Sequence, residues 1–84
     1  MSNFATHSGA RLVWCLRRRA TDVQCLAFGR TPVEVRVVHG GDMVITEMFQ
    51  EEWMALDWAR LYADRLRAQG WYDVVEAAES AKAG

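Results

Sequence analysis

The spacing of apolar residues changes once along this chain, from every second residue before residue 50 to every third or fourth residue after it. Alternation of apolar and polar residues is typical of strands that are covered on one face. A period of 3.6 residues, which holds over residues 51–69, is typical of an amphipathic helix. A run of strands followed by one helix predicts an α+β domain.

Turn residues divide the first half of the chain into strands, which we expect at residues 11–18, 23–28, 33–38 and 43–49. Pro32 lacks an amide hydrogen and Gly29 tolerates positive φ, so the chain is expected to turn between them. Gly40 and Gly41 supply the positive φ that both central positions of a two-residue type I′ hairpin require. These turns predict a three- to four-stranded antiparallel β-meander.

The expected helix has one broad apolar face, which would pack on one face of the sheet. Gly70 suits the left-handed residue that follows a helix, and Trp71 can fold back on Leu66 or Arg67 in a Schellman-type end. Trp53 lies off the apolar face, where it is either an anchor for a partner or packed over Phe49 or the sheet edge. The apolar face consists of Met54, Ala55, Trp58, Ala59, Leu61, Tyr62, Ala63 and Leu66.

One helix covers only one face of the sheet, so the strand register decides what the other face presents. Pairing Phe28 with Val33 and Cys15 with Cys25 places bulky residues on one face, which we expect the helix to cover. Those bulky residues are Leu12, Trp14, Leu16, Leu26 and Phe28. The opposite face would carry the small apolar residues Val13, Cys15, Val23, Cys25, Ala27 and Val38. We expect this face to form a homodimer or to bind a protein partner; the alternatives are solvent exposure and coverage by the C-terminal segment.

The chain length of 84 residues admits a single hydrophobic core. We expect a disordered arm at residues 1–9, one domain at residues 10–71, and a short helix or flexible tail at residues 72–84. The first residues lack the basic and apolar regions of a signal peptide, and no stretch approaches the ~20 apolar residues of a membrane helix. These features predict a cytoplasmic protein that does not enter a membrane.

Charge is distributed unevenly about the Gly40–Gly41 pair. Residues 1–40 hold six Arg against two acidic residues, whereas residues 41–84 hold four cationic against nine acidic residues. The best candidates for contact with a nucleic acid or an acidic partner are Arg11, Arg17, Arg19 and Arg36. The isoelectric point near 6.1 is low for a nucleic-acid-binding domain, and ion pairs with the acidic helix are the alternative.

No segment carries a catalytic, metal or cofactor signature. Cys15, Cys25, His7 and His39 lack the close Cys and His pairs of structural zinc sites, so we expect no metal. The two cysteines are expected to be small buried thiols, and Glu51 and Glu52 to be charges of the first helical turn. No phosphate-binding glycine motif occurs, so we expect neither a cofactor nor an enzyme.

A set of structural positions spread over residues 12–71 resembles a class of short uncharacterised bacterial proteins, which consist of a β-meander and one helix that ends in Gly-Trp. The residues that carry the resemblance are Trp14, Cys15, Leu16, Cys25, Val33, Glu34, Val35, Gly41, Phe49, Ala55, Ala59, Leu66, Gly70 and Trp71. The resemblance implies the fold and no activity. The element order also resembles a plant type of DNA-binding domain and the arm-type domain of phage integrases, which bind DNA with a sheet.

From the sequence we therefore expect a small protein-interaction module, acting as a homodimer or adaptor through the small-residue sheet face or through Trp53. The alternative is a nucleic-acid-binding domain that uses an arginine-rich sheet face.

Overall fold

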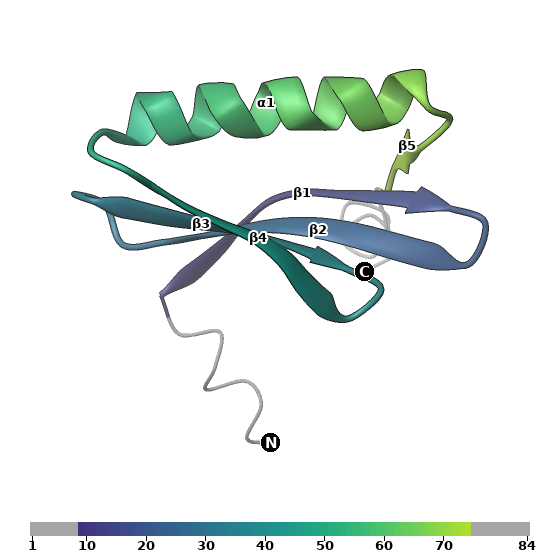
Figure 1. Cartoon of the computed structure of the whole chain (residues 1–84), viewed down its shortest axis with the longest axis horizontal. Helices are drawn as coiled ribbons and strands as arrows, with labels where there is room; N and C mark the ends of the chain where they lie inside the picture. Colours follow the sequence, from purple (N-terminus) through teal and green to yellow (C-terminus); the bar gives the residue numbers. More distant parts are fainter. Residues whose placement is uncertain (1–8, 75–84) are drawn as a thin grey trace, which may run out of the picture.

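A meander of four antiparallel strands is followed by a single helix that lies along one face of the sheet (Figure 1). The computed structural model describes residues 9–74. The elements are β1 (Ala10–Arg18), β2 (Thr21–Phe28), β3 (Val33–His39), β4 (Asp42–Phe49), α1 (Glu52–Ala68) and β5 (Tyr72–Asp73). The predicted α+β fold is confirmed, with the strands in the order β4-β3-β2-β1-β5.

The short strand β5 was not predicted. Tyr72 and Asp73 pair with Arg17 and Leu16 of β1, so a helix or free tail that starts at residue 72 is wrong for these two positions. The backbone amide of Val74 continues this contact by donating to the carbonyl of Cys15 at 2.9 Å. The predicted arm and the remainder of the predicted tail, residues 1–8 and 75–84, lie outside the described residues.

The β3–β4 hairpin follows the predicted geometry. His39 pairs with Asp42, and the two residues between them, Gly40 and Gly41, have φ of 60° and 95°. Both values lie in the left-handed region that a type I′ turn requires and that glycine adopts without a Cβ clash. The local sequence therefore determines this turn.

The end of α1 also has the predicted form. Gly70 has φ of 100°, its amide donates to the Arg67 carbonyl at 3.0 Å, and the Trp71 amide donates to the Leu66 carbonyl at 3.1 Å. These two bonds are those of a Schellman motif. They turn the chain back toward the sheet and place Trp71, which is 9% exposed, under the end of the helix.

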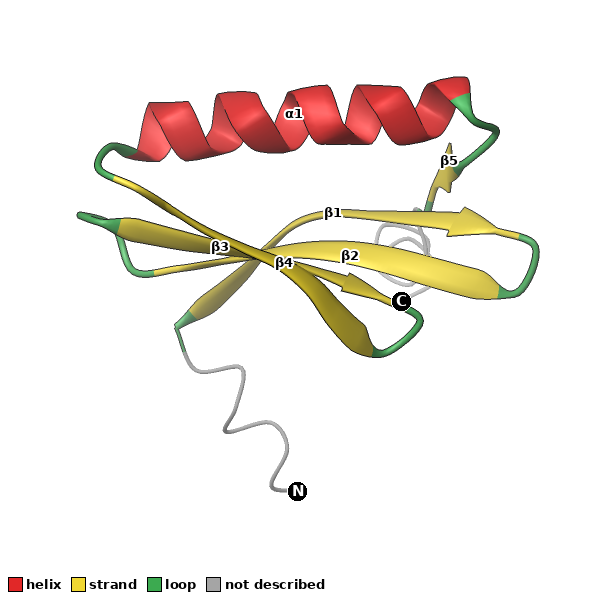
Figure 2. Ribbon diagram, in the orientation of Figure 1, coloured by secondary structure: helices red, strands yellow, loops and turns green. Residues whose placement is uncertain are grey.

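The helix lies along one face of the sheet (Figure 2), and its buried residues are all small. Ala55, Ala59 and Ala63 recur every fourth residue and are at most 1% exposed. The indole nitrogen of Trp14 donates to the main-chain carbonyl of Ala59 at 2.8 Å, which is possible because no large side chain separates helix and strand. The sheet residues beneath them are Leu16, Val23, Cys25, Ala27, Val33, Val35 and Val37.

The predicted register of β2 is wrong by one residue. Phe28 pairs with Glu34 instead of Val33, because the connection between β2 and β3 is one residue longer than expected. Cross-strand partners share a face, so this shift exchanges the two faces of β2. Val23, Cys25 and Ala27 lie under the helix, and Leu26 and Phe28 lie on the uncovered face.

A β-bulge in β1 accounts for a second difference between the predicted and the observed strand pairing. The pairing shifts between Leu12 and Trp14, which leaves Val13 as the extra residue of β1. Trp14 then pairs with Cys25, so the predicted Cys15–Cys25 pair is wrong. Because a bulge reverses the alternation, Trp14 and Leu16 face the helix as predicted, whereas Leu12 is on the uncovered face.

The sequence leaves the register of β4 open. Met43, Ile45 and Phe49 compete with Val44, Thr46 and Met48 for the inner face, and the structure divides both sets. Ile45 and Phe49 lie on the helix side, next to Val37 and Val33. Another irregularity, between Val37 and Val38, places Met43 beside Val38 on the opposite face, together with Thr46 and Met48. Among residues 9–74, no helix is long and apolar enough to cross a membrane.

Candidate interaction surfaces

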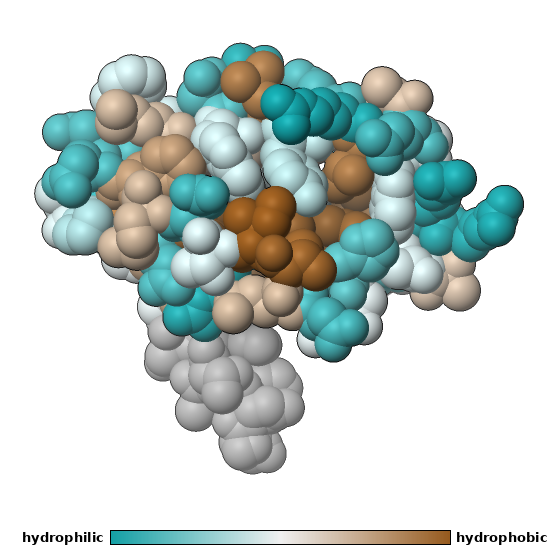
Figure 3. All heavy atoms as spheres, in the orientation of Figure 1, coloured by the Kyte–Doolittle hydropathy of each residue, from teal (hydrophilic) through white to brown (hydrophobic). Residues whose placement is uncertain are grey.

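The face of the sheet opposite α1 is covered by no other described element. We call it the open sheet face; its apolar members are Leu12, Leu26, Phe28, Val38, Met43 and Met48. Leu12, Met43 and Met48 are 56–58% exposed. Val44, at the irregularity of edge strand β4, is 52% exposed, and Figure 3 shows a hydrophobic patch over this part of the molecule. Large apolar side chains are thus concentrated on this face and along its β4 edge.

The charged residues of the open sheet face are paired with one another. Arg17 donates two hydrogen bonds to Asp22, at 2.6 and 3.1 Å, and this interaction lowers the pKa of the Asp22 carboxyl. Arg36 donates to Glu34 at 2.7 Å while its guanidinium lies 4.3 Å from the centre of the Phe28 ring. The charges of these two pairs cancel, so the face carries apolar side chains around internally neutralised ion pairs.

The predicted dimer face is only partly present. Val23, Cys25 and Ala27 are at most 1% exposed beneath α1, so they do not contribute to an interaction surface, and that part of the prediction is wrong. Cys15 and Val38 do lie on the open sheet face, and Val13 sits at the bulge, partly packed against the core. Bulky residues of β2 replace the small ones, because the register of β2 is shifted.

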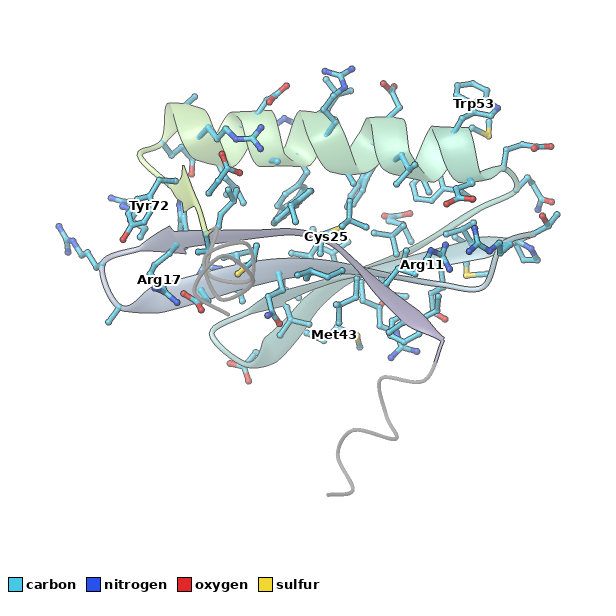
Figure 4. The ribbon with its side chains drawn as sticks, turned by 180° about the vertical axis from the view of Figure 1, so that it is seen from behind. Arg11, Arg17, Cys25, Met43, Trp53 and Tyr72 are labelled. Carbon is cyan, nitrogen blue, oxygen red and sulfur yellow. The ribbon has the colours of Figure 1, made fainter. Side chains whose placement is uncertain are left out.

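The four candidate arginines do not form one surface. Arg11 and Arg17 lie toward opposite ends of β1 (Figure 4). Arg11 is on the helix side, where its guanidinium donates to the Gly29 carbonyl at 2.8 Å and lies 3.7 Å from Glu52. Arg19 is in the β1–β2 turn with φ of 59°, and only Arg17 and Arg36 share the open sheet face. The expectation of a common arginine face is therefore wrong for Arg11.

Trp53 projects from the first turn of α1 away from the sheet and is 66% exposed (Figure 4). Packing over Phe49, the alternative considered from the sequence, is wrong: the Phe49 ring contacts Trp58, with 5.8 Å between the ring centres. Leu56 beside it is 44% exposed. Trp53 thus remains exposed on α1, on the side of the molecule opposite the open sheet face.

The junction of α1 and β5 is held by ion pairs. Arg67 donates to Asp73 at 2.9 and 3.2 Å and to Asp64 at 2.7 Å. The hydrogen bonds from Arg67 lower the pKa of the Asp73 carboxyl, and the same contacts raise the pKa of Arg67. This pair joins the end of the helix to the strand that closes the β1 edge.

We expect Asp73→Asn to lower the free energy of unfolding at pH 7 by about 0.5 kcal/mol, because both partners are solvent-exposed and screened. The lowered pKa means that this contribution is present above the ordinary pKa of the carboxyl, near 4, and is lost as pH falls through the folded-state value. Urea unfolding at pH 7 and pH 3 measures it; an equal difference between the two proteins at both pH values would contradict this assignment.

A cavity of about 450 Å³ lies between the C-terminal end of α1 and the ends of β1 and β3. Its lining residues are Arg18, His39, Tyr62, Arg65, Leu66, Gln69 and Trp71. No local sequence pattern marks this site, because its residues come from β1, β3, α1 and the segment after α1 and only the tertiary fold brings them together.

The described part of the chain was expected to contain buried thiols and no metal site. Cys15 and Cys25 are both in the thiol form, and burial raises the pKa of the Cys25 thiol to about 12. Within residues 9–74 no group of three His, Cys, Asp or Glu side chains is arranged to hold a metal ion.

The β-meander followed by one helix, which the resemblance to short bacterial proteins implies, is confirmed by the structure. Comparisons with protein-family models, curated protein sequences and solved structures gave no match to this chain.

Proposed function

We propose that this chain is a protein-interaction module that associates with a second copy of itself through the open sheet face. The observation that supports it is the concentration of exposed Leu12, Met43 and Met48 on one face of the sheet, with Val44 at its edge. In a monomer these apolar side chains remain in contact with water, which is unfavourable. Burial of the same side chains in a dimer interface removes them from water and stabilises the dimer.

The charge pattern favours a second copy of the chain over a strongly charged partner. The Arg17–Asp22 and Glu34–Arg36 pairs already neutralise each other within one chain. A two-fold dimer brings the same patch of both copies together, and a neutral patch does not repel itself. A highly acidic or basic partner would instead have to displace these internal ion pairs.

We expect the wild-type protein to be a dimer by light scattering at both low and high salt, because apolar contacts are not screened by ions. Leu12→Glu and Met48→Glu place a charge at the apolar surface of β1 and β4, respectively. In a two-fold interface each change introduces two unpaired charges. Each variant is therefore expected to raise the dimer dissociation constant about a hundredfold.

Leu56→Glu is the matched control, since Leu56 is similarly exposed but lies on the outer side of α1. Its solution mass should equal that of the wild type. A wild-type monomer at high protein concentration would refute self-association, and dimer loss with Leu56→Glu alone would move the interface to the outer helix surface near Trp53.

The nucleic-acid alternative is tested in the same experiment by adding a random oligonucleotide. Arg17 and Arg36 are ion-paired on the open sheet face, so we expect the protein mass not to change with the oligonucleotide at low salt. A low-salt complex that Arg17→Glu abolishes would favour nucleic-acid binding instead.

A further inference from the structure

The cavity at the end of α1 combines positive charge with aromatic walls. It opens between α1 and the ends of two strands, and its volume of about 450 Å³ is within the range of small-molecule sites. None of its lining residues belongs to the open sheet face. It is therefore a second feature of the molecule, independent of the proposed self-association.

Both arginines that line the cavity, Arg18 and Arg65, lack a carboxylate partner among residues 9–74. Of the nine arginines in residues 9–74, six form ion pairs with Asp or Glu side chains of the same part of the chain. The other three are Arg18, Arg19 and Arg65, and Arg18 and Arg65 both line this cavity. Outside the cavity, six of the seven arginines of residues 9–74 are neutralised by ion pairs, whereas the cavity gathers two unneutralised guanidinium groups with His39.

The walls of the cavity are flat and largely immobilised by packing. Trp71 is 9% exposed and meets the His39 ring edge-on, with 5.4 Å between the ring centres. Tyr62 belongs to an aromatic row, with its ring centre 5.4 Å from that of Trp58 and 6.0 Å from that of Trp14. Such walls suit a planar apolar group, which stacks or packs edge-on against aromatic rings.

The nearby C-terminus of α1 carries a partial negative charge that would oppose an anion. Its carbonyls are partly satisfied, because those of Leu66 and Arg67 accept bonds from the amides of Gln69, Gly70 and Trp71. Arg18 also reaches over this end: its Nε lies 4.0 Å from the position that a Cβ on Gly70 would occupy. Two full guanidinium charges therefore outweigh the residual helix dipole.

We propose that this cavity binds a small aromatic anion, an aryl phosphate or aryl carboxylate. The acidic group would be held by Arg18 and Arg65, whose planar donors match a carboxylate or phosphate. The ring would lie against Trp71 and Tyr62. His39 and Gln69 supply further polar atoms at the mouth of the cavity.

Phenyl phosphate, benzoate and inorganic phosphate are the probes, each titrated into the full-length protein and followed by NMR of the Trp71 indole. Either aryl probe should give saturable shifts, and the comparison of the two distinguishes phosphate from carboxylate ligands. Inorganic phosphate should bind more weakly, because it has no ring to contact Trp71. We expect Arg18→Gln and Arg65→Gln each to weaken aryl binding about tenfold.

Arg19→Gln is the matched control: Arg19 is adjacent to Arg18 and lacks a carboxylate partner among residues 9–74, but it does not line the cavity. Its affinity should equal that of the wild type, and circular dichroism checks that every variant folds. Non-saturable shifts with both aryl probes would overturn the proposal. If Arg19→Gln weakened aryl binding as much as Arg18→Gln does, the proposal would also be overturned, since this would indicate general charge attraction. If inorganic phosphate bound as tightly as phenyl phosphate, the proposed contact between the ligand ring and the aromatic walls would be refuted.

Discussion

Replacing Ala59 with Leu is expected to lower the free energy of unfolding by about 3 kcal/mol, the upper part of the usual range for overpacking a core. Ala59 is fully buried at the centre of the helix–sheet contact, and its carbonyl accepts the Trp14 indole hydrogen at 2.8 Å. Three added carbon atoms would push the helix away from the sheet and break this bond to β1. In a domain of this size the loss is a large part of the total stability.

Ala68→Leu is the matched control, because it makes the same chemical change at an exposed position of the same helix. Urea unfolding should place it within about 0.5 kcal/mol of the wild type. Equal stabilities of the two variants would contradict close packing of α1 on the sheet, whereas a lower stability for Ala59→Leu alone supports the alanine contact.

Features that depend on a few neighbouring residues were predictable from the sequence. The hairpin at Gly40 and Gly41 requires positive φ at adjacent positions, and glycine meets this requirement without help from the rest of the fold. The end of α1 is similarly encoded by Gly70 and Trp71, whose amides bind the last carbonyls of the helix. The period of the helix identified Ala55, Ala59 and Ala63 as part of the buried face. These local signals were sufficient for the fold class.

Strand register was not predictable in the same way, because a single extra residue exchanges the two faces of a strand. The bulge at Val13 and the longer β2–β3 connection each add one such residue. The assumption that the helix covers the bulkier face also failed for β2. The alanines of α1 bring the helix close to the sheet, and the close approach favours Val23, Cys25 and Ala27 beneath it over Leu26 and Phe28.

The cavity at the end of α1 could not be predicted from the sequence, because it too depends on contacts between residues that are far apart in the chain. Arg18 lies between Arg17 and Arg19, which the sequence offered as candidate contacts, and strand alternation places Arg18 on the opposite face from them. In the structure these residues separate: Arg17 pairs with Asp22, Arg19 is in a turn, and Arg18 reaches the helix end near Gly70. Only the tertiary contacts place Arg65 and His39 beside it.

Cys25 is expected to react with thiol reagents about a thousandfold more slowly in the folded protein than in urea, because it is fully buried under α1. Only opening of the helix–sheet contact would expose its sulfur, and burial also disfavours the reactive thiolate by raising the pKa of Cys25 to about 12. Alkylation of the Cys15→Ala variant, followed by mass spectrometry, isolates this thiol. Rapid native-state labelling would contradict its position in the core.

The raised pKa of Cys25 also makes the free energy of unfolding depend on pH. The folded protein retains the thiol proton up to about pH 12, whereas the unfolded chain releases it near its ordinary pKa of 9.0. Between pH 9 and pH 12 a rise in pH favours the unfolded chain, because only the unfolded chain releases the thiol proton. Over this range Cys25 lowers the free energy of unfolding by about 1.4 kcal/mol per pH unit. Because other groups titrate in the same range, the measurement is the difference between wild type and Cys25→Ala in urea unfolding at pH 8 and pH 10.5. Wild type should lose more stability over that interval, and parallel losses in both proteins would show that Cys25 is not held as a buried neutral thiol.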